Sequence, residues 1–97
     1  MPNKNEYEAM SNIINEKIAV ITSFDPYTGK VIPHKIKWQG RVYKIVKTGF
    51  HYPMRQGRKL LHYFGVVSEN NTSFKLKLDT DNLHWTLEET IDEFATN

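Results

Sequence analysis

The chain has 97 residues, of which 39% are hydrophobic, 25% charged and 12% aromatic, and it contains no cysteine. These values are typical of one folded domain, and they exclude a disordered chain, a disulfide scaffold, thiolate metal sites and cysteine nucleophiles. No apolar run reaches the roughly 18 residues that a membrane-spanning helix needs, and residues 1–10 lack the apolar core of a signal peptide. We therefore expect a cytoplasmic protein that does not bind membranes.

Charge is distributed unevenly along the chain, although the formal net charge is only +2. Residues 26–68 contain nine lysines and arginines and no Asp or Glu, whereas residues 1–25 and 69–97 are acidic overall. Such an asymmetry indicates a polyanionic partner. The alternative is that the acidic ends fold over the basic middle and neutralise it, and the sequence leaves both readings open.

Apolar and polar residues alternate with a period of two over most of the chain, which predicts β-strands. The candidate strands cover residues 18–24, 30–38, 41–48, 58–68, 74–78 and 83–87. Residues 49–57 contain Pro53 and two glycines and are interpreted as a long basic loop. Six short strands predict a mainly β fold, a small antiparallel barrel or roll.

Short terminal helices are predicted in addition, because apolar residues recur at helical spacing near both ends. These residues are Tyr7, Met10, Ile13 and Ile14 at the N-terminus and Leu87, Ile91 and Phe94 at the C-terminus. Residues 86–89, Thr-Leu-Glu-Glu, also have the form of a capping box. Residues 1–16 are accordingly interpreted as an N-terminal extension that includes a short helix, and residues 17–97 as a single β-rich domain that ends in another.

Gln39-Gly40 joins two candidate strands and predicts a tight hairpin, because glycine accepts the positive φ that such turns need. The register that follows pairs Trp38 with Arg41, Lys37 with Val42, Ile36 with Tyr43, Lys35 with Lys44 and His34 with Ile45. Lys35 and Lys44 would repel each other there, and a bound anion would relieve the repulsion. Two lysines that extend separately into water are the alternative.

Aromatic residues are interleaved with cations in the basic segment, as in single-stranded nucleic-acid binding, where rings stack on bases and cations contact phosphates. Trp38, Tyr43 and Phe64 fall at positions that a small barrel fills, and are assigned to the core. The predicted nucleic-acid-binding residues are Lys35, Lys37, Lys44, Phe50, His51, Tyr52, Arg55, Arg58 and Lys59. Arg41 is a further candidate contact, and a cation–π contact with Trp38 is its alternative role.

The sequence favours a binding function over an enzymatic one. The basic middle has no carboxylate, the four histidines lack metal-ligand spacing, and no phosphate-binding glycine motif occurs. We therefore expect no catalytic residue, metal or cofactor. The alternative function is a protein-interaction adaptor or homo-oligomerising domain, in which an exposed strand edge and the 49–59 loop bind an acidic protein or a second copy of the chain.

Residues 33–45 resemble a motif of a family of small bacterial domains of unknown function. The matching residues are Pro33, Ile36, Trp38, Gly40, Arg41, Tyr43 and Ile45, with Ile36 at a position where the family pattern has an aromatic residue. Phe64, Phe74-Lys75-Leu76, Asp79 and Trp85-Thr86-Leu87 follow in a similar order, so the likeness covers roughly residues 18–92. The resemblance implies a single β-rich domain and assigns it no activity.

Overall fold

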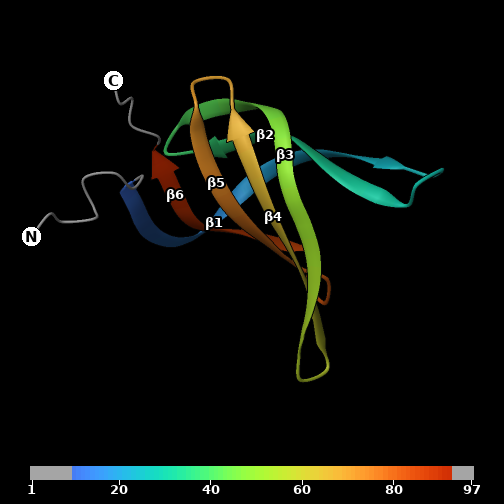
Figure 1. Ribbon diagram of the computed structural model, residues 1–97. Coiled ribbons are helices and arrows are strands. Elements are labelled where there is room, and N and C mark those ends of the chain that lie inside the picture. The colour runs from blue at the N-terminus through green and yellow to red at the C-terminus, as the bar shows by residue number, and fades with distance from the viewer. Residues whose placement is uncertain (1–9, 93–97) are drawn as a thin grey trace, which may run out of the picture.

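Six antiparallel strands form a closed barrel in the computed structural model, which describes residues 10–92 (Figure 1). The strands are β1 (Met10–Asp25), β2 (Lys30–Trp38), β3 (Arg41–Gln56), β4 (Lys59–Ser68), β5 (Thr72–Asp79) and β6 (His84–Asp92). Each strand pairs with the next along the chain, and β6 pairs with β1 to close the ring. The mainly β antiparallel barrel that the alternation predicted is confirmed.

The predicted terminal helices are wrong within the described residues, because Met10–Asp25 and His84–Asp92 are strands. The two segments pair from Met10↔Asp92 to Ile18↔Trp85, and this pairing removes the two open edges that a six-stranded sheet would otherwise have. Tyr7 and Phe94 lie outside the described residues. Residues 10–16, assigned by the sequence to an N-terminal extension, belong to β1.

A bulge interrupts the alternation of β6. Leu87 and Glu89 lie opposite Leu76 and Lys75, which are adjacent in β5, so Glu88 is an extra residue in the strand. Leu87 and Thr90 are therefore both buried although they are three positions apart. Ile91, which follows Thr90, lies on the other side of the strand from Leu87, so the apolar spacing that suggested a helix does not mark one buried face.

The predicted loop at residues 49–57 is also wrong, because β3 continues to Gln56 and pairs with β4 as far as Gln56↔Lys59. Gly49 marks a bulge between Thr48 and Phe50 and does not end the strand. Pro53 is tolerated because β3 pairs with β2 only up to Lys44, so this part of β3 has one unpaired edge where a missing N–H costs nothing.

The hairpin at residues 38–41 has the predicted register over four pairs, including Lys35↔Lys44 and Trp38↔Arg41. The fifth predicted pair, His34 with Ile45, is wrong. The pairing of β2 with β3 ends at Lys35, and Ile45 lies opposite Ser68 of β4 instead.

The turn of this hairpin has positive φ at both central residues, 54° at Gln39 and 74° at Gly40. Because asparagine tolerates this conformation better than glutamine, Gln39→Asn is expected to raise the free energy of unfolding by about 0.5–1 kcal/mol. Gly40→Ala is the matched opposite change and should lower it by about 1 kcal/mol. Urea unfolding of both variants measures this, and a less stable Gln39→Asn protein would contradict the turn geometry.

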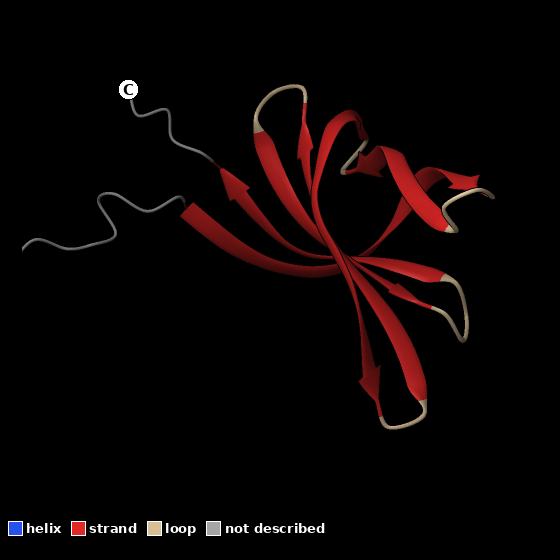
Figure 2. Ribbon diagram, turned by 45° about the vertical axis from the view of Figure 1, so that its right-hand side comes forward, coloured by secondary structure: helices blue, strands red, loops and turns tan. Residues whose placement is uncertain are grey.

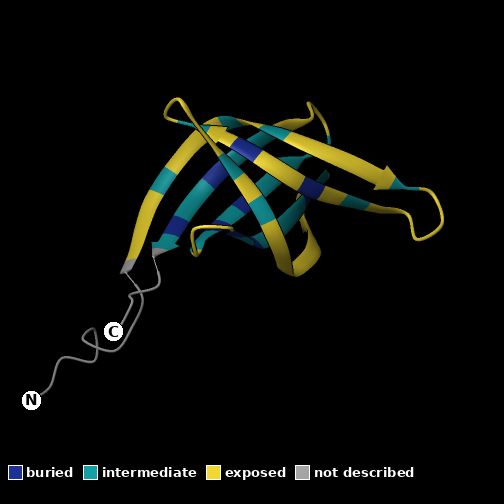
Figure 3. Cartoon of the chain, turned by 90° about the horizontal axis from the view of Figure 1, so that it is seen from above, coloured by how far each residue is buried: buried dark blue, intermediate teal, exposed yellow. Residues whose placement is uncertain are grey.

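The core fills the inside of the barrel, and the strand surfaces that face away from it are largely exposed (Figure 3). Its fully buried members are Ile36, Phe64, Val66, Phe74, Leu76 and Leu87. Phe64 was correctly assigned to the core, and Trp38 and Tyr43 pack against it while partly buried. Pro33 is buried beside a bulge at His34, since Thr22 pairs with Pro33 and Ile21 with Lys35.

Two hairpins project from the barrel in different directions because β2 and β3 pair over only four residues each (Figures 1 and 2). We call residues 21–34, the end of the β1–β2 hairpin, the first arm, and residues 49–65, the end of the β3–β4 hairpin, the second arm. Among residues 10–92, their divergence leaves one edge of β3 without a neighbouring strand along the second arm.

Candidate functional site

The structure divides the nine predicted nucleic-acid-binding residues into separate groups. Lys35, Lys37 and Lys44 form the first, on the outer face of β2 and β3, and all three are exposed. Lys35 and Lys44 lie directly opposite each other, as the register predicted. They share this face because Ile36 and Tyr43, their neighbours in sequence, point to the core. We call these three residues the lysine face.

Phe50 and Tyr52 belong to a second group, a row of three aromatic rings on the outer face of β3 and β4. The ring centroids of Phe50 and Tyr52 are 5.6 Å apart with an interplanar angle of 25°, and those of Tyr52 and Tyr63 are 5.3 Å apart at 22°. Phe50 is 44% and Tyr52 37% exposed to solvent. We call Phe50, Tyr52 and Tyr63 the aromatic row.

Gly65 makes room for this row. It pairs with Phe50, and a Cβ atom at Gly65 would lie 2.1 Å from the Phe50 ring. Any side chain at this position would therefore displace the ring, so the glycine allows Phe50 to lie across β4.

Cations from two strands border the aromatic row. The Lys75 ammonium lies 5.3 Å from the centroid of the Tyr63 ring. Lys47 is exposed and lies opposite Val67, which is two residues from Gly65 on the outer face of β4. Tyr63, Lys75 and Lys47 are not among the predicted site residues, because only the pairing of β3, β4 and β5 brings them beside Phe50 and Tyr52.

The lysines of β5 also contact a carboxylate. Glu88 lies 3.9 Å from the Lys75 ammonium and 3.6 Å from that of Lys77. Partly exposed pairs at such distances are weak, so both lysines remain available to a stronger anion. Partial burial, with the nearby Glu88 as the second cause, raises the pKa of Tyr63 above its ordinary value. Its hydroxyl therefore stays protonated at neutral pH and is a hydrogen-bond donor.

His51 does not lie with Phe50 and Tyr52, because it is on the opposite side of β3. It pairs with the buried Phe64, and the two rings stack with centroids 4.1 Å apart and an interplanar angle of 11°. Its Nε2 atom is 2.8 Å from Nδ1 of His62, and the tautomer decides which nitrogen donates. The pKa of His51 is lowered mainly by partial burial of the ring, and to a smaller extent by the nearby His62 and Lys30.

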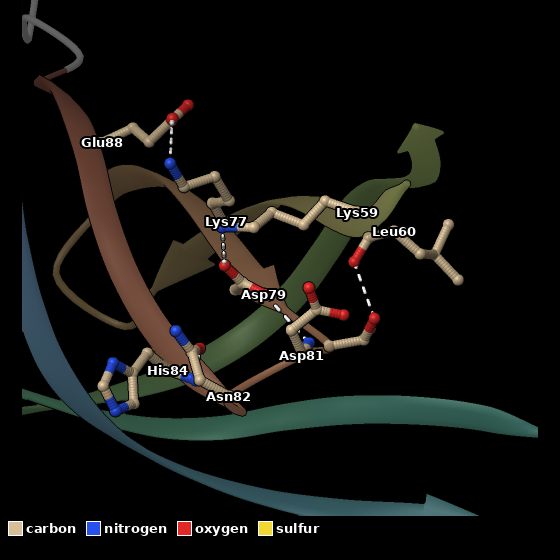
Figure 4. A network of polar contacts seen from close by, with 9 residues as sticks. Lys59, Leu60, Lys77, Asp79, Asp81, Asn82, His84 and Glu88 are labelled. Carbon is tan, nitrogen blue, oxygen red and sulfur yellow. Dashed lines mark hydrogen bonds and ion pairs between the residues drawn. The ribbon is translucent and has the colours of Figure 1, made fainter. Parts of the chain in front are cut away.

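Arg55, Arg58 and Lys59 form the third group, at the end of the second arm. Lys59 makes an ion pair of 3.0 Å with Asp79 (Figure 4). The backbone N–H of Asp81 also donates a hydrogen bond to this carboxylate. This hydrogen bond is the main cause that lowers the pKa of Asp79, and the contact with Lys59 is the second. Arg55 lies eleven positions after Lys44 in β3, which is about 35 Å of extended chain. The nine residues therefore do not form one continuous patch.

The acidic ends do not neutralise the basic middle within residues 10–92. Of the nine lysines and arginines between positions 26 and 68, Lys59 is the one with an ion pair in this part of the chain. Glu88 contacts the lysines of β5, and Glu89 accepts a hydrogen bond from the Ser11 hydroxyl at 2.8 Å. Glu6, Glu8 and Glu93 lie outside the described residues, and nothing is described of the Asp92 side chain.

Arg41 has a structural partner that differs from the expected one. Its guanidinium lies 5.1 Å from the centroid of the Tyr43 ring, so the cation–π contact is with Tyr43. Trp38 instead donates its indole N–H to Glu16 at 3.2 Å.

In the range from Met10 to Asp92, no three histidine, aspartate or glutamate residues gather as metal ligands. The same range contains no helix with the length and apolar character needed to cross a bilayer. Comparison of the chain with protein-family models, curated proteins and solved structures found no match. Fold and site together define a closed antiparallel β-barrel that carries an aromatic row bordered by cations.

Proposed function

We propose that the protein binds single-stranded RNA or DNA, with bases stacking against the aromatic row and phosphates contacting the neighbouring lysines. The aromatic row is the observation that carries this proposal, since two of its rings are more than one-third exposed on a strand face where a polar surface is the norm. Single strands are favoured over duplexes because the faces of paired bases are covered by stacking within the helix.

The cations around the row support the same function. Lys47 and Lys75 lie beside the row, and the lysine face continues along β3 toward the barrel. Arg58 lies at the tip of the second arm. Rings interleaved with cations along one strand suit a nucleic-acid backbone that follows β3. Recognition would depend on stacking and phosphate contacts and would therefore tolerate different base sequences.

Salt dependence tests the phosphate contacts. Affinity for a 12-nucleotide single strand should fall steeply with salt, and Lys47→Gln should reduce the slope of log affinity against log salt by about 0.7. Arg41→Gln is the matched control, because Arg41 lies at the other end of β3 over the Tyr43 ring. The measurement is fluorescence anisotropy at several salt concentrations. Absence of binding at low salt, or binding that salt does not weaken, would rule the function out.

A second function is favoured by one observation, the unpaired edge of β3 along the second arm. Such an edge accepts an additional strand through backbone hydrogen bonds, either from a second copy of the chain or from an acidic protein segment. Sedimentation of the same samples without nucleic acid separates the two functions. A dimer that dissociates when an edge-blocking proline replaces Arg55 of the second arm would support the adaptor, whereas a monomer that binds the oligonucleotide would support the first function.

A further inference from the structure

A cleft of about 330 Å³ lies where the two arms diverge. Its lining residues are Lys30, Val31, Ile32, Thr48, Gly49, Phe50 and His51. The first arm contributes Lys30 and the second arm contributes His51, so the cleft depends on the short pairing of β2 with β3. Phe50 belongs both to this cleft and to the aromatic row, so the cleft adjoins the row.

His51, which lines this cleft, and its hydrogen-bond partner His62 have unused hydrogen-bonding capacity. His51 Nε2 and His62 Nδ1 share one hydrogen bond of 2.8 Å, and stacking against Phe64 holds the His51 ring in place. The other nitrogens, Nδ1 of His51 and Nε2 of His62, have no hydrogen-bond partner among residues 10–92. A protonated His51 would donate Nε2–H to His62 and have Nδ1–H free to donate to a ligand.

The charges around His51 favour an anion. The titratable and charged groups that act on its ring are His62 from β4 and Lys30 from β2, while Phe64 and the adjacent Trp85 are uncharged. Neither histidine nor Lys30 has an ion pair with a carboxylate in the part of the chain that the structure describes. Burial and these neighbours lower the pKa of His51, so the ring is mostly neutral at pH 7.

We propose that this cleft binds a phosphate group between Lys30 and His51, and that a backbone phosphate of the nucleic acid stacked on Phe50 occupies it. The identity of this occupant, a nucleic-acid phosphate, rests on the proposed function. A phosphate beside His51 favours the imidazolium and raises the His51 pKa. Affinity therefore increases as the pH falls through the His51 pKa of the complex, and it levels off below the lower pKa of the free protein.

The experiment measures oligouridylate affinity by anisotropy at pH 7.5 and pH 5.5, since uracil and the phosphodiester do not titrate in this range. The intact protein should bind at least five times more tightly at pH 5.5, and His51→Gln should remove most of this difference. Lys30→Gln, a change at an exposed residue that leaves the fold intact, should weaken binding at both pH values. His84→Gln is the matched control and should retain the full pH dependence, because His84 lies on β6 away from the cleft.

An NMR titration of the histidine rings with inorganic phosphate identifies the source of the anion. A rise in the His51 pKa on addition of phosphate, together with pH-dependent oligouridylate binding, supports the inference. A phosphate-induced rise without pH-dependent oligonucleotide binding overturns the backbone occupant and assigns the cleft to free phosphate. Oligouridylate binding that is unaffected by pH, with no effect of phosphate on His51, overturns the inference and leaves the proposed function standing. A complete lack of oligouridylate binding is instead a failure of the proposed function.

Discussion

Replacing Tyr52 with alanine is expected to weaken the binding of a single-stranded oligonucleotide roughly 5- to 150-fold, because stacking of one base on an aromatic ring contributes about 1–3 kcal/mol. Tyr52 is the middle ring of the aromatic row and contacts Phe50 on one side and Tyr63 on the other. Its loss removes a stacking surface and also frees the Phe50 ring. Fluorescence anisotropy at low salt measures the effect.

Tyr27→Ala is the matched control for this change. Tyr27 is 96% exposed at the turn of the first arm and lies outside the aromatic row, so its removal should leave the affinity unchanged. An equal loss of affinity in both variants would show that exposed tyrosines act nonspecifically and would contradict a role for the row.

Gly65→Ala tests the same surface from β4 without removing a ring. The added methyl group displaces the Phe50 ring, so affinity should fall about as far as in Phe50→Ala, and the double variant should bind no worse than either single one. Additive losses in this cycle would mean that Gly65 and Phe50 act independently.

Replacing Phe74 with alanine is expected to have the largest effect on stability, lowering the free energy of unfolding by about 3–5 kcal/mol. Phe74 is 1% exposed, and its ring packs edge-on against Tyr43 at 5.0 Å and against Trp38 at 6.3 Å. A loss of this size is a substantial share of the roughly 5–15 kcal/mol that stabilises a typical domain.

Urea unfolding followed by tryptophan fluorescence measures this loss. Val42→Ala is the control on the strand that carries Tyr43, and because Val42 is 61% exposed its replacement should cost less than about 1 kcal/mol. A Phe74→Ala protein as stable as the control would mean that the β5 side of the barrel does not contain the core.

Much of the fold is predictable from local patterns, because a strand with one buried face shows its pattern in the sequence. Phe74 and Leu76 alternate with Lys75 and Lys77, and in the structure the first two are buried and the lysines face outward. The hairpin at Gln39-Gly40 was predictable for a similar reason, since a two-residue turn determines the register of the strands that it joins.

The errors occurred where a strand departs from regular alternation. Glu88 and Gly49 are bulge positions, and the one-residue shift at each interrupts the alternation by which a strand is recognised in the sequence. The segment around Pro53 also depends on the unpaired edge of β3, and no local pattern reveals which edge of a strand lacks a neighbour.

The sequence alone determined that this protein is a β-rich domain with an acid-free basic segment in which aromatic residues are concentrated. Only the tertiary structure decided that Phe50 and Tyr52 join Tyr63 and Lys75 on one face while His51 points the other way toward His62. Alternation along one strand separates neighbours such as Phe50 and His51 onto opposite faces, whereas pairing between strands brings residues more than ten positions apart into contact. That pairing depends on how the strands are arranged next to one another, which no single strand of the chain encodes.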